Sequence, residues 1–242
     1  MRKKGEKDSF WPSYVDIVTT LFAIMVVLFA VSYSRFRVKE VELRKIADKY
    51  EEIKSIYKVV ENIDSTFFAF NPDLVKFIFK IQVTFQTGEF ELTNKLEADR
   101  FNKAQADSLR EEVRKAGLEI QGTISKLVND TTITKHDIKY LVVIEGQASA
   151  DGYGRRNGKY DKYFNNDVLS YQRAFYLNQF WKDNDIDFSS MEKCELVISG
   201  SGEKGVPRDT TDEKLNQRFL IHIVPVIGNI RLDDAQKSVV NR

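Results

Sequence analysis

One carboxylate stands inside an otherwise uncharged apolar stretch near the start of this 242-residue chain. Asp16 is the only charged residue between Asp8 and Arg35, and a long run of apolar side chains follows it. A carboxylate inside a membrane helix costs about 2.5–3.5 kcal/mol on insertion scales, so such residues mark ion pathways or paired partners. Asp16 therefore predicts ion or proton handling in a membrane.

The stretch around Asp16 is long enough to cross a bilayer. Its apolar part runs for about 20 residues, the length that spans the hydrocarbon core. No small-x-small cleavage site precedes the polar segment that follows, which predicts an uncleaved single-pass anchor over residues 10–34. Basic residues flank both ends, and those in the tail 1–9 favour an N-terminus in the cytoplasm.

Composition excludes several other classes of function. The 37 basic and 36 acidic residues nearly cancel, so the overall charge gives no argument for binding nucleic acid. The single cysteine, Cys194, cannot form an internal disulfide and is expected to be a small buried residue. His136 and His222 stand apart with no nucleophile–base pair, so we expect neither an enzyme nor a metal or organic cofactor.

The segment 35–65 predicts a stalk helix. Its apolar residues recur three and four positions apart, as in the a and d positions of a short coiled coil. They are Leu43, Ile46, Tyr50, Ile53, Tyr57 and Val60. The pattern favours a dimer, although a helix that packs against its own domain would show the same stripe.

The apolar pattern over residues 66–230 predicts one α+β domain, and a tail over 231–242 follows it. The pattern predicts strands near 83–92, 141–145, 195–199 and 219–224, and helices within 96–127 and 168–181. A short helix at 72–80 is also expected, because Pro72 fits a first helical turn. The expected order is β/α/β/α/β-β.

Four motifs follow one another in this domain. They are Gly146 at a strand end, the Asn166 to Ala174 segment N-x-x-L-S-x-x-R-A, the Gly200 to Pro207 segment G-x-G-E-x-x-x-P, and Asn216-Gln-Arg218 before the last strand. Together, in this order and spacing, they resemble the OmpA-like peptidoglycan-binding domain. The resemblance covers the C-terminal half of the chain.

The segment from Asn166 to Arg173 could form an anion site. Asn166 is expected to cap the helix, with Leu169 and Ser170 in its first turn, so that backbone N–H groups face the preceding loop. Arg173 offers a planar fork suited to a carboxylate. The resemblance implies that Arg173 binds the diaminopimelate carboxylate of the peptide stem; an internal ion pair is the structural alternative.

The chain departs from the OmpA-like pattern at one position. The family places an acidic residue three positions after the strand-closing glycine, where this sequence has Ser149. Asp151 comes two residues later, so we expect either a shifted loop that brings Asp151 into that space or weaker binding of the ligand's ammonium group. Arg218 completes the set of residues assigned to peptidoglycan by the resemblance.

The membrane helix, stalk and wall-binding domain together resemble the MotB-type subunits of rotary stator motors. Within that group the N-terminal run looks most like the ZorB subunits of the Zorya anti-phage defence system. The resemblance implies a dimer inside a ring of five ZorA-like subunits in the bacterial inner membrane, with the C-terminal domain in the periplasm on peptidoglycan.

The same resemblance gives Asp16 a mechanism. Asp16 would bind and release a proton as the surrounding subunits change its environment, and Thr19 and Thr20 would line the ion path. Back-bonding of these hydroxyls to the helix is an equally good interpretation. A sodium ion would need several oxygen ligands, so a proton is the preferred coupling ion.

Other classes of protein share parts of this pattern. A flagellar MotB-like or an ExbD/TolR-like motor subunit would use the same physics in a different setting, and neighbouring genes would separate them. A passive cell-wall anchor would explain the C-terminal motifs but would leave Asp16 without a role.

Overall fold

The computed structural model describes residues 10–83, 85–92, 103–130, 138–156 and 159–226. The expected tails 1–9 and 231–242 lie outside these residues. The chain divides into two compact units, one of them over Glu52–Ile230 and the other containing Met1–Glu51.

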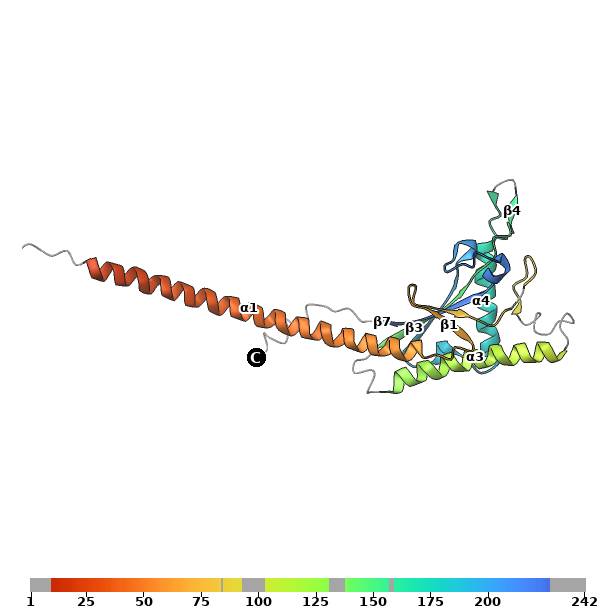
Figure 1. The fold of residues 1–242 in the computed structure, drawn as a ribbon, viewed down its shortest axis with the longest axis horizontal. Helices are drawn as coiled ribbons and strands as arrows, with labels where there is room; N and C mark the ends of the chain where they lie inside the picture. The colour runs from red at the N-terminus through yellow and green to blue at the C-terminus, as the bar shows by residue number, and fades with distance from the viewer. Residues whose placement is uncertain (1–9, 84, 93–102, 131–137, 157–158, 227–242) are drawn as a thin grey trace, which may run out of the picture. The chain divides into compact units, whose positions relative to one another are not determined.

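One continuous helix, α1 (Phe10–Glu61), contains the expected membrane span and most of the expected stalk, which was predicted to run to residue 65 (Figure 1). It is the one helix in the described part of the chain that is long and apolar enough to cross a membrane, with a mean hydropathy of 2.4 in its most apolar window. Pro12 lies in its first turn, where a missing N–H costs no helical hydrogen bond.

The predicted a/d stripe divides between the two units. Leu43, Ile46 and Tyr50 are exposed, whereas Val60 is buried in the core of the Glu52–Ile230 unit together with Ile56. The last turns of α1 thus pack against their own domain. The dimer stays a prediction, for which the exposed part of the stripe provides the surface.

A five-stranded mixed sheet forms the centre of the Glu52–Ile230 unit, in the order β1-β2-β7-β3-β6. The strands are β1 (Phe68–Asn71), β2 (Lys76–Phe79), β3 (Lys139–Gly146), β6 (Cys194–Gly200) and β7 (Phe219–Val226). β3 runs parallel to β6 and antiparallel to β7. A separate hairpin joins β4 (Arg155–Arg156) to β5 (Lys159–Tyr160).

Two long helices complete the core, α3 (Lys103–Asn129) and α4 (Asn166–Asp183), and α4 packs on β3 and β6 (Figure 1). Three 3₁₀ turns, η1 (Phe188–Ser190), η2 (Gly202–Lys204) and η3 (Glu213–Asn216), connect the later elements. The buried side chains of α3 recur at helical spacing, which is why this segment forms a helix with one apolar face. The α+β class is confirmed, together with the expected strands near 141–145, 195–199 and 219–224.

Two local predictions are wrong. The segment 72–80 is not a helix, because Asn71 Oδ1 accepts a hydrogen bond from Leu74 N and Val75 adopts a positive φ, which makes a turn between β1 and β2. Described residues between 83 and 92 form no strand. Val83 and Phe85 are both buried there, but Phe85 N donates to the side chain of Gln217 instead of to a neighbouring strand.

Gly117 does not interrupt α3, because its missing side chain makes room for Trp181. A Cβ at Gly117 would lie 2.6 Å from Trp181 Nε1, an atom that donates to Val113 O at 2.8 Å. We expect Gly117→Ala to lower the free energy of unfolding by about 1–3 kcal/mol, since overpacking outweighs the better helix propensity. Chemical denaturation, monitored by tryptophan fluorescence, measures this change in the free energy of unfolding.

Gly122 on the same helix is the matched control. A Cβ there meets nothing within 4 Å, so Gly122→Ala should raise stability by up to about 1 kcal/mol. Equal effects of the two substitutions would contradict the role given to Trp181.

Candidate functional site

Asp16 lies in the second turn of α1 with its side chain exposed. Thr19 and Thr20 follow three and four residues later and share its face of the helix. The Thr19 hydroxyl donates to Val15 O at 2.7 Å and approaches Asp16 O at 3.0 Å, so its proton is held by the backbone. This is the back-bonded arrangement expected as one alternative, and it leaves the Thr19 oxygen available as an acceptor.

The N-terminus of α4 is capped one residue earlier than predicted. Asn165, not Asn166, is the cap, and its side chain accepts from Asp167 N and Val168 N, both at 2.9 Å. Asn166 instead donates from Nδ2 to Ser149 O at 3.0 Å and to Glu203 Oε2 at 3.2 Å. Asn166 therefore links α4 to the loop after β3 and to η2.

Leu169 and Ser170 are both buried in the first turns of α4. Ser170 Oγ donates to Asp167 O at 2.8 Å and accepts from Gly202 N at 2.9 Å. Both residues thus position α4 against the core and η2. Gly146 permits this close packing, because a Cβ there would collide with the carbonyl of Ser170.

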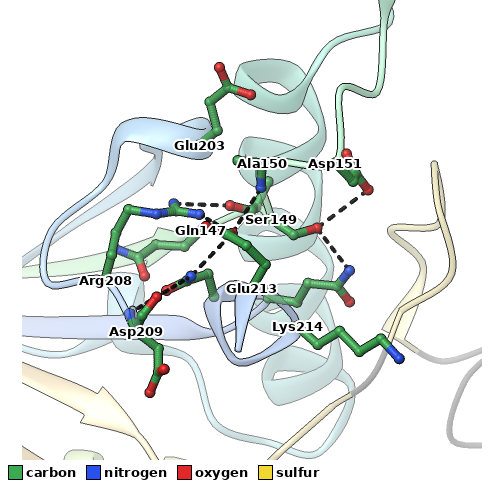
Figure 2. Close-up of polar contacts among 12 residues, drawn as sticks. Gln147, Ser149, Ala150, Asp151, Glu203, Arg208, Asp209, Glu213 and Lys214 are labelled. Carbon is green, nitrogen blue, oxygen red and sulfur yellow. Dashed lines mark hydrogen bonds and ion pairs between the residues drawn. The ribbon is translucent and has the colours of Figure 1, made fainter. Parts of the chain in front are cut away.

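The loop after β3 brings Ser149 and Asp151 together. Ser149 Oγ lies 3.3 Å from Asp151 Oδ2 (Figure 2) and accepts from Gln217 Nε2 at 3.1 Å. Asp151 Oδ1 accepts from Tyr153 N at 3.0 Å. Glu213 fixes the same loop through a bond from Ala150 N to its Oε2 at 3.0 Å. Asp151 thus lies directly beside Ser149, the position where the OmpA-like pattern has its acidic residue.

Arg173 is buried beneath this loop. Its Nε donates to Glu89 O at 3.0 Å, and its guanidinium carbon lies 4.4 Å from the centre of the Phe85 ring. Its Nη1 is buried and has no hydrogen-bond partner among the described residues. Burial lowers the pKa of Arg173 to about 10, against the opposing effect of Asp151, Glu89 and Tyr153, so the group is still a cation at neutral pH.

A cavity of about 580 Å³ adjoins these residues. Its lining comprises Phe85, Gln86, Thr87, Ser149, Ala150, Asp151, Glu213, Lys214 and Gln217. Phe85 connects the cavity to Arg173, because its ring lies against the guanidinium. The cavity therefore has an exposed carboxylate, Asp151, in its lining and the buried Arg173 cation behind Phe85. These two charges suit a ligand that carries both a carboxylate and an ammonium group.

Arg218 directs its hydrogen bonds away from this cavity. Its Nε donates to Gln147 Oε1 at 3.0 Å and its Nη2 donates to Pro207 O at 2.7 Å. Gln147 Nε2 also donates to Pro207 O, at 3.2 Å. Arg218 therefore holds the segment around Pro207 against the loop that carries Ser149.

The end of β3 is fixed by a buried ion cluster. Glu145 Oε2 contacts Lys76 Nζ at 3.0 Å and His222 Nε2 at 2.7 Å, and Lys76 also donates to Val206 O at 3.0 Å. Burial alone would raise the pKa of Glu145, but hydrogen bonds from His222, Ser201 and Lys76 together lower it to about 2.

This cluster makes stability depend on pH. The native pKa of Glu145 is depressed from 4.5, so its contribution is present above pH 4.5 and is lost as the pH falls towards 2. We expect Glu145→Gln to cost about 2–3 kcal/mol at pH 7, and the difference from the wild type to shrink between pH 5 and pH 2. Urea titrations at several pH values measure it; a difference independent of pH would contradict the ionised state of Glu145.

Comparison with known proteins gives a likeness of structure only. No protein-family model matches the chain, and no curated protein matches it. A MotB-like protein from Desulfovibrio vulgaris is similar at 15% identity, over 73% of this chain and 92% of that one, with a TM-score of 0.37. The OmpA-like domain of FopA1 from Francisella tularensis is similar at 18% identity, over 66% and 78% of the two chains, with a TM-score of 0.31. The C-terminal domain of Helicobacter pylori MotB is similar at 11% identity, over 65% and 93%, with a TM-score of 0.31.

Sequence reasoning missed several residues of the cavity. Phe85, Glu213 and Gln217 line it, although none of them was predicted as a binding residue. Gln217 lies within the Asn216-Gln-Arg218 motif, so that motif was the available signal. Phe85 had none, because it meets Arg173 and Gln217 only through the fold.

Proposed function

We propose that this protein is a membrane-anchored, peptidoglycan-binding subunit of a proton-driven rotary motor. α1 would cross the bacterial inner membrane once with the N-terminus in the cytoplasm, and Asp16 would carry the proton. The Glu52–Ile230 unit would hold the cell wall in the periplasm. The proposed role is mechanical and ion-conducting, with no enzymatic step.

The observation that carries this proposal is the coexistence of two sites in one chain. A lone carboxylate in an apolar helix has no use in a passive anchor, and a cavity beside a buried cation has no use in a simple ion channel. The guanidinium of Arg173 would bind a carboxylate of the peptide stem. The carboxylate of Asp151, which contacts Ser149, would bind the ammonium group of the same stem residue. Both ends of a diaminopimelate-like group are then matched.

The finer assignment rests on the sequence around Asp16. Its resemblance to ZorB subunits supports a dimer of this chain within a ring of five ZorA-like subunits, acting in defence against phage. The exposed residues Leu43, Ile46 and Tyr50 supply a surface for pairing two copies of α1. Thr19 and Thr20 would face the ion path beside Asp16.

The proposal is tested on the full-length protein in lipid nanodiscs and in cells. The wild type must sediment with purified peptidoglycan sacculi, and its co-expression with a ZorA-like membrane subunit must allow proton flux. Failure to bind sacculi would remove the anchoring role, and absence of proton flux would remove the motor.

A further inference from the structure

Two aromatic side chains stand out on the surface of the Glu52–Ile230 unit. Tyr163 and Phe164 are each 65% exposed, more than any other large apolar residue that the structure describes in this unit. They lie between β5 and α4, at the base of the β4–β5 hairpin, which projects from the unit (Figure 1). Contiguous exposed apolar surface with a polar rim is a feature of interaction sites.

The backbone beneath these rings is held by several hydrogen bonds. Asp161 Oδ1 accepts from Tyr163 N at 2.8 Å and from Phe164 N at 2.9 Å. Asp161 N donates to Gly154 O at 2.7 Å, and Asn165 Nδ2 donates to Asp161 O at 2.8 Å. The rings are thus presented on a fixed base, so that little ordering is required when a ligand binds.

A glycine makes this arrangement possible. Gly154 has φ +75°, and a Cβ there would collide with the carbonyl of Phe164. Only a residue without a side chain lets the two segments lie so close. The close contact with Gly154, at the start of the hairpin, therefore fixes the backbone position of Phe164.

The segment 151–154 links the aromatic pair to the cavity. Tyr153, next to Gly154, donates its backbone N–H to Asp151 Oδ1, and its ring packs against Gly88 beside the cavity residue Thr87. The backbone that carries the pair is therefore only a few residues from the cavity lining, so a polymer whose side group enters the cavity has the pair nearby.

The chemistry of the pair fits a sugar polymer with acidic groups. Pyranose rings present C–H groups on their faces, which pack on aromatic rings, and hydroxyls on their edges, which stay in water. Lys162 Nζ lies 5.2 Å from the centre of the Tyr163 ring, and Lys159 is exposed on β5. These two lysines bring positive charge to the aromatic pair, which suits an anionic partner.

We propose that Tyr163 and Phe164 bind the glycan strand of peptidoglycan, while the neighbouring cavity binds its peptide stem. This inference rests on the proposed wall-binding function and adds a second ligand class to it. A sugar polymer fits better than a lipid surface. Asp161 and Lys162 flank the rings, and insertion of the rings into a bilayer would bury these charged residues at a cost in free energy.

The test compares the wild type with the double variant Tyr163→Ser and Phe164→Ser, as full-length protein in nanodiscs. The probes are glycan strands freed of peptide by an amidase, the free stem peptide, and phosphatidylglycerol vesicles. We expect the double variant to bind peptide-free strands at least about tenfold more weakly, since lost aromatic packing of this size costs one order of magnitude in affinity. Its affinity for the stem peptide should be unchanged.

Tyr171→Ser, which removes another exposed ring on α4, is the control and should leave strand binding unchanged. Equal strand binding by the double variant and the wild type would overturn the inference, and so would a loss seen only with vesicles. Wild-type protein that binds strands but not the stem peptide would overturn the proposed cavity function and still support the aromatic pair.

Discussion

Asp16→Asn is expected to abolish proton flux and phage protection completely while the protein still inserts and assembles. Asparagine has nearly the same shape as aspartate but cannot bind and release a proton at this position. Asp16 is the only charged residue between Asp8 and Arg35, so no neighbouring group in this chain can take its place. Plating efficiency of phage and proton flux into proteoliposomes measure the two effects.

The matched control for this substitution is Asp48→Asn, which makes the same change at an exposed position further along α1. It should retain both activities. Full phage protection by Asp16→Asn, with normal amounts of protein in the membrane, would show that the carboxylate does not couple ion flow to function.

Arg173→Met is expected to weaken binding of the peptide stem by about 10- to 100-fold, because hydrogen bonds to charged groups contribute about 1.5–3 kcal/mol. Methionine keeps most of the side-chain bulk over Phe85 but removes a buried cation whose Nη1 has no partner among the described residues. The free energy of unfolding should fall by less than about 1 kcal/mol or even rise. Isothermal titration with the free stem peptide, with denaturation in parallel, separates binding from folding.

Two further variants sharpen the result. Arg173→Lys retains the charge without the planar fork and should also lose affinity. Arg114→Ala removes a cation from α3 that pairs with Glu111 on the same helix, and it should bind as the wild type does. A large loss of stability with unchanged affinity in Arg173→Met would show that Arg173 serves the fold and not the ligand.

Local sequence patterns predicted the strands that are continuous apolar runs and the helices whose apolar residues recur every three to four positions. β3, β6 and β7 are strands where apolar runs predicted them, and α3 and α4 are helices where apolar residues recur at helical spacing. The pattern failed at Val83 and Phe85, because both side chains are buried in the core while Phe85 N bonds to the side chain of Gln217 and not to a strand. Alternation alone does not distinguish this from a strand.

The sequence predicted several candidate residues of the site, but not the residues that they contact. The motif identified Arg173, but its partner surface comes from Phe85 and Glu89, which lie 84 or more positions away in the chain. Asp151 was one of the alternatives considered for the acidic residue missing at Ser149, and its carboxylate lies 3.3 Å from the Ser149 hydroxyl. Capping by Asn165 rather than Asn166 was beyond sequence reasoning, since both are asparagines at adjacent positions.

The place of β3 in the sheet has a mechanical consequence for the proposed wall-binding function. The loop with Ser149 and Asp151 leaves the end of β3, which is paired at seven positions with β6 and at eight with β7. When a strand is pulled sideways from the edge of a sheet, its hydrogen bonds break one after another. Tension applied to that loop along β3, by contrast, would load the hydrogen bonds to β6 and β7 together, so that many bonds share the force. An anchor held in this way would resist the pull of a turning motor better than its thermodynamic stability alone suggests.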